Sequence, residues 1–351
     1  MQSDLAEFRK DFPALAQTVR GKQLVYLDNA ATALKPQCVV DAVSLYNSRD
    51  TANVHRGVYY LSEKATAAYE GVRTSVKQLL NASDPGEIVF ARGTTEAINL
   101  VAASYGRTFL RAGDEIVLTT IEHHSNIVPW QLICGQTGAR LRIAPVNDHG
   151  ECILEEYEKL LSDRTRIVSI GHVSNAIGTI HPIKRMTTMA HQAGAVVLLD
   201  GAQAAPHMPV DVRDIDCDFY AFSGHKLYGP TGIGVLYGKA HLLGKMPPYQ
   251  GGGEMIHSVS FDKTDYKNAP YKFEAGTPAI AEAIGLGAAV EYVRSIGLDR
   301  IASREGELLS DATSRLSGVT GLKIIGNARD KAAIVSFVLD GIHPHDIATI
   351  L

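Results

Sequence analysis

Two ionisable residues, Asp200 and Lys226, each follow a short apolar run that has the length of a β-strand. The run Ala195–Leu199 ends in Asp200, and the run Asp218–Phe222 leads into the Ser-Gly-His-Lys sequence that ends at Lys226. A carboxylate that follows Val-Val-Leu-Leu is expected to be shielded from water, and an unpaired buried carboxylate is costly. We therefore expect Asp200 to have a cationic partner, either Lys226 or a bound cofactor cation.

Two interpretations of this pair are open. In the first, Lys226 is an ordinary loop lysine and Asp200 caps a helix. In the second, the two residues hold pyridoxal 5'-phosphate: the amine binds the cofactor's aldehyde, and the carboxylate keeps the pyridine nitrogen protonated. Ser223 and His225 flank the lysine and could contact the phosphate. We favour the second interpretation because Ser-Gly-His-Lys occurs together with Asp-Gly-Ala-Gln at 200–203 and a matching pattern of glycines.

Thr94 and Thr95 follow a glycine at the expected start of a helix. Free backbone amides, two hydroxyls and the helix dipole favour a phosphate there, although a plain N-cap is the alternative. His123 could ligate a metal beside His124, but no third ligand with suitable spacing follows, so no metal is predicted. A ring stacked on a flat cofactor suits His123 better, and we expect His124 to be exposed.

Four further polar residues are candidates for contacts with the cofactor or the substrate, on weaker evidence. Asn175 and Gln203 can hydrogen-bond the substituents of the cofactor ring, or each can simply cap a turn. His55 and Arg56 could bind a substrate carboxylate, the arginine through a bidentate pair. A surface turn is an equally good interpretation for that dipeptide.

Strand-like and helix-like segments alternate from residue 87 to residue 238, which predicts an α/β fold: a mostly parallel sheet with helices on both faces. Ligands on such sheets bind at the carboxyl ends of the strands. The candidate residues at 94, 123, 175, 200 and 226 all follow predicted strands, so we expect them to share one cleft. We also predict a strand at Leu24–Leu27 and a region poor in regular structure from Tyr249 to Pro278.

Two domains are predicted. Residues 20–280 form a large cofactor-binding domain, and residues 1–19 with 281–351 form a smaller α+β domain. The second unit is expected to hold one long helix and two short strands.

The 351-residue chain has 45% hydrophobic and 21% charged residues and a net charge of −4. These values are those of an ordinary enzyme, and they argue against nucleic-acid binding. No apolar run has the length of a membrane span, and no signal peptide is expected from the acidic first residues. Four cysteines do not make a disulfide framework in a chain this long, which favours a reducing, cytoplasmic location.

Several motifs together resemble those of a known family. They are Asn-Val-His-Arg at 53–56, Arg-Gly-Thr-Thr-Glu at 92–96, Glu-His-His at 122–124, Asp-Gly-Ala-Gln at 200–203, Ser-Gly-His-Lys at 223–226, Gly-Gly-Gly at 251–253 and Glu-Ala-Gly-Thr-Pro at 274–278. The sequence resembles the group II cysteine desulfurases, the sulfur-mobilisation and selenocysteine-lyase-like members of the class V aminotransferase family. The resemblance runs from Phe8 to Leu351.

The resemblance implies the pyridoxal phosphate-dependent transferase type I fold. It implies an enzyme that converts L-cysteine to L-alanine and an enzyme persulfide, which supplies sulfur to an acceptor protein for Fe–S cluster assembly. Lys226 and His123 are the implied catalytic residues, Asp200 pairs with the pyridine nitrogen, and Gln203 contacts the phenolic oxygen. The implied phosphate contacts are Thr95, Ser223 and His225, with Thr277 lent by the other subunit of a homodimer.

One departure from the family pattern concerns sulfur transfer. The family's persulfide-forming cysteine lies in a loop that follows a strand and helix resembling residues 333–351, and Cys38, Cys134, Cys152 and Cys217 do not match it. We therefore expect a small domain truncated at its C-terminal end and no desulfurase activity from these 351 residues alone. Cys38 and Cys152 begin predicted helices, where the pKa of a thiol can fall.

Three alternatives stay open at this point. The enzyme could be a selenocysteine lyase that acts on L-selenocysteine, or it could catalyse another class V reaction such as transamination. It could also be a non-catalytic protein that binds pyridoxal phosphate.

Overall fold

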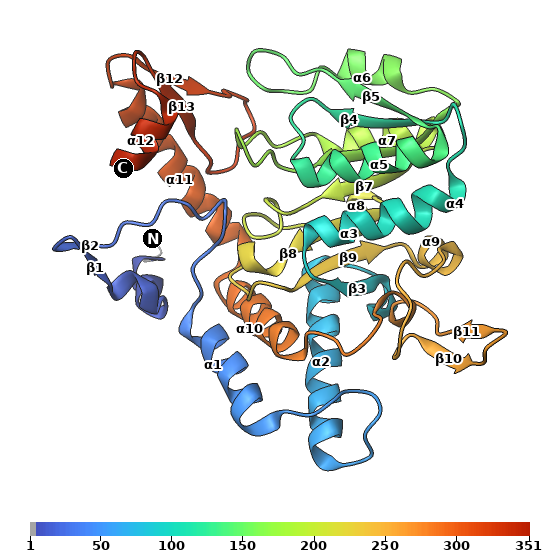
Figure 1. Ribbon diagram of the computed structural model, residues 1–351. Helices are drawn as coiled ribbons and strands as arrows, with labels where there is room; N and C mark the ends of the chain where they lie inside the picture. Colours follow the sequence, from blue (N-terminus) through green and yellow to red (C-terminus); the bar gives the residue numbers. More distant parts are fainter. Residues whose placement is uncertain (1–4) are drawn as a thin grey trace.

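The apolar runs between turn residues form the strands of one large sheet. The computed structural model describes residues 5–351, and within them this sheet has seven strands (Figure 1). In spatial order they are β3 (Ile88–Ala91), β9 (Gly234–Gly238), β8 (Phe219–Ser223), β7 (Val196–Asp200), β6 (Thr165–Gly171), β4 (Glu115–Thr119) and β5 (Arg140–Ala144). From β8 to β5 all neighbours are parallel, whereas β9 is antiparallel to β3 and β8. The predicted mostly parallel sheet is confirmed.

The connections between these strands are largely helical, as parallel pairing requires. The α-helices of the described chain are α1 (Gln37–Leu45), α2 (Tyr60–Leu79), α3 (Thr94–Val101), α4 (Arg107–Phe109), α5 (Val128–Thr137), α6 (Leu154–Leu160), α7 (Ile183–Gln192), α8 (Val212–Ile215), α9 (Ala240–Lys245), α10 (Ile280–Ile296), α11 (Leu298–Ser317) and α12 (Pro344–Ile350).

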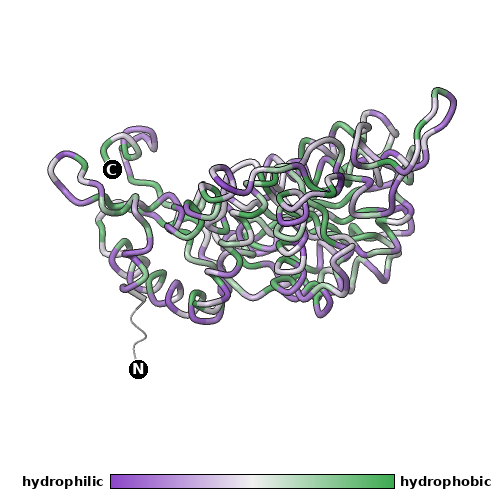
Figure 2. Tube along the Cα trace, turned by 90° about the horizontal axis from the view of Figure 1, so that it is seen from below, coloured by the Kyte–Doolittle hydropathy of each residue, from purple (hydrophilic) through white to green (hydrophobic). Residues whose placement is uncertain are grey.

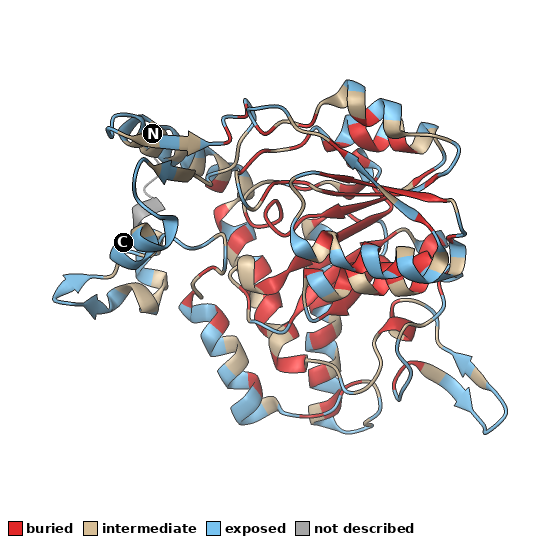
Figure 3. Ribbon diagram, turned by 45° about the horizontal axis from the view of Figure 1, so that its top comes forward, coloured by how far each residue is buried: buried red, intermediate tan, exposed pale blue. Residues whose placement is uncertain are grey.

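Helices cover both faces of the sheet, so its strands are largely buried on both sides, except for the mostly exposed edge strand β5 (Figure 3). Side chains that are adjacent along β7 point to opposite faces. Leu198 joins a core with Ile98 of α3 and Trp130 of α5, whereas Leu199 joins the other core with Val72 of α2 and Met186 of α7. Each face of the sheet therefore has its own hydrophobic core, and the sheet is the rigid layer between them.

Smaller elements project from the two ends of this layer. The hairpin β12 (Leu322–Ile325) and β13 (Ser336–Leu339) lies with α11 and α12 at one end, and the hairpin β10 (Ile256–Val259) and β11 (Thr264–Tyr266) extends from the other (Figure 2). A third, short hairpin pairs β1 (Thr18–Val19) with β2 (Lys22–Gln23). Helix α10 packs against α1 and α2. The division into domains at residues 19 and 280 stays a prediction.

Two predictions about local structure are wrong. Leu24–Leu27 is not a strand: it is a segment with no strand partner, and the side chains of Val25 and Leu27 are exposed. A short apolar run indicates burial only when a neighbour is there to cover it. The region from Tyr249 to Pro278 is more regular than expected, because it contains the β10–β11 hairpin. Among residues 5–351, no helix is both long and apolar enough to cross a membrane.

Candidate active site

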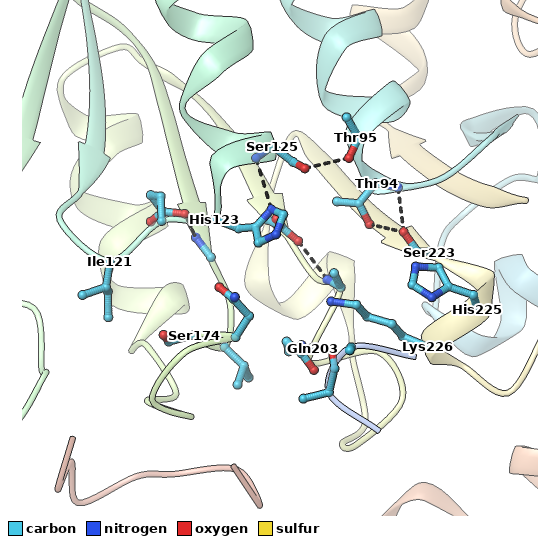
Figure 4. A pocket seen from close by; sticks show the side chains of 18 of the residues that line it. Thr94, Thr95, Ile121, His123, Ser125, Ser174, Gln203, Ser223, His225 and Lys226 are labelled. Atoms are coloured by element: carbon cyan, nitrogen blue, oxygen red, sulfur yellow. Dashed lines mark hydrogen bonds between the residues drawn. The ribbon is translucent and has the colours of Figure 1, made fainter. Parts of the chain in front are cut away.

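The carboxyl ends of the parallel strands surround a cavity of about 460 Å³. Nine of the residues singled out from the sequence line it: Thr94, Thr95, His123, Asn175, Asp200, Gln203, Ser223, His225 and Lys226. They come from loops that are far apart in the sequence, and Figure 4 shows several of them around the same space. The expectation that these loops share one cleft is confirmed.

Lys226 ends a short 3₁₀ turn, Gly224–Lys226, that directly follows β8. Its side chain extends into the pocket toward His123 (Figure 4). Burial lowers the pKa of Lys226, and the charge of Asp200 opposes that effect. The Lys226 amine makes no hydrogen bond within the described residues. A partly desolvated amine without a fixed partner is suited to act as a nucleophile or a base.

Asp200 is the last residue of β7, where it is buried in the wall of the pocket. Burial raises the pKa of its carboxyl group, and Lys226 and His123 contribute in the opposite direction. Its Oδ1 accepts one hydrogen bond, from the backbone N–H of Ala202 at 2.9 Å. The carboxylate is therefore shielded from water without a direct ion pair, which is an environment that a bound cation would stabilise.

His123 lines the pocket from the loop after β4. The backbone N–H of Ser125 donates to Nδ1 of His123 at 3.1 Å, so the ring is fixed and Nδ1 acts as an acceptor. Burial lowers the pKa of the imidazole, against the influence of Asp200. At neutral pH the ring is therefore a neutral, flat surface that faces the Lys226 amine (Figure 4).

The N-terminus of α3 forms the polar end of the pocket. Ser223 Oγ accepts the backbone N–H of Thr94 at 2.8 Å and lies 2.8 Å from the Thr94 hydroxyl, which joins the end of β8 to the start of α3. The Thr95 hydroxyl lies 2.6 Å from that of Ser125. Hydroxyl groups and the positive end of a helix dipole at one place provide a binding site for an anion.

The pocket also contains polar atoms that the protein itself does not satisfy. Gln203 donates from Nε2 to the carbonyl of Ala30 at 2.8 Å, but its buried Oε1 has no hydrogen-bond partner within the described residues. Asn175 lines the pocket after β6. An amine, a shielded carboxylate, an unpaired amide and an anion site match the aldehyde, pyridine nitrogen, ring oxygen and phosphate of pyridoxal phosphate. The residues present therefore fit that cofactor.

Glu122 is a residue of this site to which sequence reasoning assigned no role. Its carboxylate accepts hydrogen bonds from Thr119 Oγ1 at 2.6 Å, Asn126 Nδ2 at 2.7 Å and the backbone N–H of Gly171 at 2.8 Å. Burial raises the pKa of Glu122 to about 7 although these donors oppose it. The only signal in the sequence was its place before His123, which does not distinguish a buried glutamate from an exposed one.

Three predicted site residues lie outside this cavity. His55 Nε2 is 2.9 Å from Glu70 Oε1, and the Arg56 guanidinium pairs with Glu254. Thr277 lines a neighbouring cavity of about 470 Å³. Their proposed contacts with substrate and phosphate stay predictions.

None of the four cysteines lines the cavity. The prediction that a helix start lowers a thiol pKa is wrong for Cys38 and Cys152: burial raises the pKa of both, that of Cys152 to about 11. Cys217 is fully buried, and burial also raises its pKa. In the described part of the chain, no group of three His, Cys, Asp or Glu side chains is placed to hold a metal ion.

The sheet, the strand-end pocket and the lysine after β8 define a class V aminotransferase, and the family model for aminotransferase class V matches residues 25–351. The chain belongs to the cysteine desulfurases within this family. It is 55% identical over 348 residues to a cysteine desulfurase of Synechococcus elongatus, covering 99% of this chain and 56% of that protein. It is 52% identical to a probable cysteine desulfurase of Halalkalibacterium halodurans, covering 98% and 85% respectively.

A solved structure gives the same result. The cysteine desulfurase CsdA (S-sulfonic acid) of Escherichia coli superposes with a TM-score of 0.91 at 45% identity, over 98% of this chain and 84% of that one. The predicted family and fold class are therefore confirmed, and membership of the family implies pyridoxal phosphate as the cofactor. The chain spans little more than half the length of the Synechococcus relative.

Proposed function

We propose that this protein is a pyridoxal phosphate-dependent cysteine desulfurase that converts L-cysteine to L-alanine and delivers the sulfur atom to a thiol as a persulfide. The reaction balances without an external oxidant: the carbon–sulfur bond of cysteine breaks, a sulfur–sulfur bond forms, and the carbon that loses sulfur gains a proton. Selenocysteine cleavage and transamination are alternatives that the same pocket could support, and the products formed from L-cysteine and L-selenocysteine distinguish them.

The observation that carries the proposal is the position of Lys226 with respect to Asp200 and His123. A desolvated amine, a buried carboxylate and a flat neutral ring line one cavity. When bound, pyridoxal phosphate would supply an electron-poor ring that stabilises negative charge on the substrate carbon. Lys226 would hold the aldehyde carbon, and Asp200 would hold the protonated pyridine nitrogen.

The chain's own residues then account for the remaining steps. The Lys226 amine, once free, takes the proton from the substrate Cα and returns protons to the substrate, because its lowered pKa leaves a larger fraction of it neutral. His123 covers one face of the site and excludes water. Thr95, Ser223 and His225 orient the phosphate, and Gln203 offers its unpaired Oε1 to the ring hydroxyl.

The sulfur-accepting thiol is not among the four cysteines of these 351 residues, in this proposal. It must reach the sulfur of a substrate in the cavity, and Cys38, Cys134, Cys152 and Cys217 are all absent from the cavity wall. We infer that the thiol belongs to a loop outside residues 1–351, as the resemblance implies, and that an acceptor protein receives the sulfur for Fe–S cluster assembly.

Two further parts of the proposal concern the assembly and its location. Thr277 lies on a loop that lines a cavity beside the Lys226 pocket, so a homodimer in which it reaches the partner's phosphate is consistent with its position. All four cysteines are free, which is compatible with a reducing cytoplasmic environment.

The experiment is to incubate the full-length protein with L-cysteine and to measure L-alanine and sulfide together. We expect equal amounts of the two products in the presence of a reductant, and none from Lys226→Ala. Pyridoxamine phosphate that accumulates without sulfide would replace the proposal with transamination. Turnover of L-selenocysteine alone would replace it with selenocysteine cleavage.

A further inference from the structure

The peptide that precedes Lys226 is held by a segment almost two hundred residues away in the sequence. The His225 carbonyl oxygen accepts hydrogen bonds from the backbone N–H of Ala33 at 3.1 Å, from the Lys35 ammonium at 2.8 Å and from the Thr32 hydroxyl at 3.3 Å. A carbonyl oxygen has two lone pairs, so three donors saturate it. The Thr32 hydroxyl also lies 3.1 Å from His225 Nδ1. The plane of the peptide next to Lys226 is therefore fixed from outside its own loop.

Lys35 is the charged member of this set. Its ammonium group also donates to the carbonyl of Ala33, and it forms no ion pair with a carboxylate among residues 5–351. Burial lowers the pKa of Lys35 to about 8. A half-buried ammonium that binds only carbonyl groups is more costly than an exposed one, but its hydrogen bonds are stronger than those of a neutral donor. The half-buried charge of Lys35 therefore serves to hold the His225 carbonyl in place.

The same segment also reaches the pocket. Asp28, Ala30 and Ala31 line the cavity, and the carbonyl of Ala30 accepts the hydrogen bond from Gln203. Lys35 itself is not part of the cavity wall. Residues 28–35 thus contact two of the loops that carry cofactor-binding residues, and the contact of Lys35 with the residue next to Lys226 is its hydrogen bond to the His225 carbonyl.

We propose that Lys35 is a positioning residue that sets the direction from which the Lys226 amine enters the pocket, by holding the carbonyl of His225. The proposal rests on the proposed function, because Lys226 must be the residue that binds the cofactor's aldehyde. Attachment requires the amine to approach one carbon atom from one direction, and small errors in such placement have large effects on rate. Binding of the ring and phosphate does not require it.

The test measures covalent attachment of the cofactor to Lys226 separately from non-covalent binding of its ring and phosphate. Protein freed of cofactor is mixed with pyridoxal phosphate, and the growth of the visible absorbance band gives the rate of attachment to Lys226. Pyridoxine 5'-phosphate, which has no aldehyde, gives the affinity of the same pocket without attachment. For Lys35→Met we expect attachment to slow about tenfold, as the loss of one charge-assisted hydrogen bond predicts. The affinity for pyridoxine phosphate should change by less than about threefold.

Three variants make the comparison specific. Lys22→Met removes an exposed lysine of β2 whose side chain makes no hydrogen bond to His225 within the described residues, and it should match the wild type. Lys35→Arg can still donate to the carbonyl and should recover most of the rate. If Lys35→Met does not fold, Thr32→Val removes the weaker hydroxyl contact and should slow attachment about threefold.

The failures of the two proposals differ. A wild type that develops no visible band with pyridoxal phosphate overturns the proposed function. If the wild type develops the band and Lys35→Met attaches the cofactor at the same rate as the wild type, only the inference about Lys35 is overturned. An equal loss of attachment rate and of pyridoxine phosphate affinity in Lys35→Met also overturns it, because that result would mean a general structural role.

Discussion

Two buried charged clusters in this protein are built in opposite ways. In the first, Arg73 on α2 is 1% exposed and every charge has a partner: its guanidinium bonds Glu70 Oε2 at 2.9 Å, Glu274 Oε1 at 2.9 Å and the carbonyl of Ile88 at 2.7 Å. It also lies 4.5 Å above the ring of Phe90. This cluster joins α2, β3 and the loop that carries Thr277.

In the second cluster, at the pocket, the charges are left without ion pairs. Asp200 is buried with one backbone hydrogen bond to its carboxylate, the Lys226 amine is unpaired within the described residues, and Glu122 is bound only by neutral donors. Burial raises the pKa of both carboxyl groups and lowers that of the lysine.

This difference distinguishes the charges that hold the fold together from the charges that belong to the candidate active site. A buried charge that is fully paired stabilises the fold only as long as the pair is complete. Buried charges that have no partner in the protein lower its stability. Groups whose pKa is shifted in this way cluster at sites where a bound ligand supplies the missing partner.

Arg73→Met should have the largest effect on stability. It leaves Glu274 buried without its cation, and breaking a buried pair in this way costs about 3–5 kcal/mol in the free energy of unfolding. Denaturant unfolding of the cofactor-free protein measures it. The control is Arg315→Met, which breaks the exposed pair with Asp311 on α11 and should leave the free energy of unfolding almost unchanged. Equal losses for the two variants would contradict the contrast.

Glu122→Gln should change how stability depends on pH. The pKa of Glu122 in the folded protein, about 7, lies above its unfolded value, so the folded state binds a proton more tightly. The contribution of this group is therefore fully present at low pH and is lost as pH rises through about 7. From about pH 5 to pH 8 the wild type should lose about 2–3 kcal/mol more than Glu122→Gln. Parallel pH profiles of the two proteins would be evidence against a shifted carboxyl group at this position.

Asp200→Asn should have a small effect on the cofactor-free protein and a large one on catalysis. Asparagine can still accept the hydrogen bond from Ala202 but no longer places a desolvated charge in the core, so the free energy of unfolding should stay within about 1 kcal/mol of the wild type or rise. Alanine release from L-cysteine should fall sharply. A stability loss as large as that of Arg73→Met would mean that Asp200 is a structural charge.

Replacing the cysteines should have the smallest effect. The protein is treated with L-cysteine, and persulfide on each thiol is detected by mass spectrometry after alkylation. We expect no persulfide on Cys38, Cys134, Cys152 or Cys217, because none lines the cavity and burial raises the thiol pKa of each. Cys134→Ser should release alanine at the wild-type rate. A persulfide on any of the four would show that sulfur transfer uses a different route.

The sequence predicted the sheet and most of the pocket because both depend on local patterns. Apolar runs that end in polar residues determine where Thr94, Asp200 and Lys226 lie, since the ends of parallel strands meet at one edge. The role of Lys35 could not be predicted, because it depends on a contact with His225 that only the tertiary fold creates. The same holds for Arg73, whose partner Glu274 is 201 residues away. The prediction of a strand at Leu24–Leu27 was wrong for a related reason: whether a strand forms depends on a neighbouring strand that the local sequence does not specify.

The most direct measurement of the central claim is a titration of the cofactor-free protein with pyridoxal phosphate, followed by visible absorbance and by unfolding. The wild type should bind one cofactor per chain with a visible band, and at one hundred times the dissociation constant its free energy of unfolding should rise by about 2.7 kcal/mol. Lys226→Ala should show no such band. A wild type that is neither coloured nor stabilised, or a Lys226→Ala variant identical to it, would contradict the claim that the unpaired charges of the pocket are completed by this cofactor.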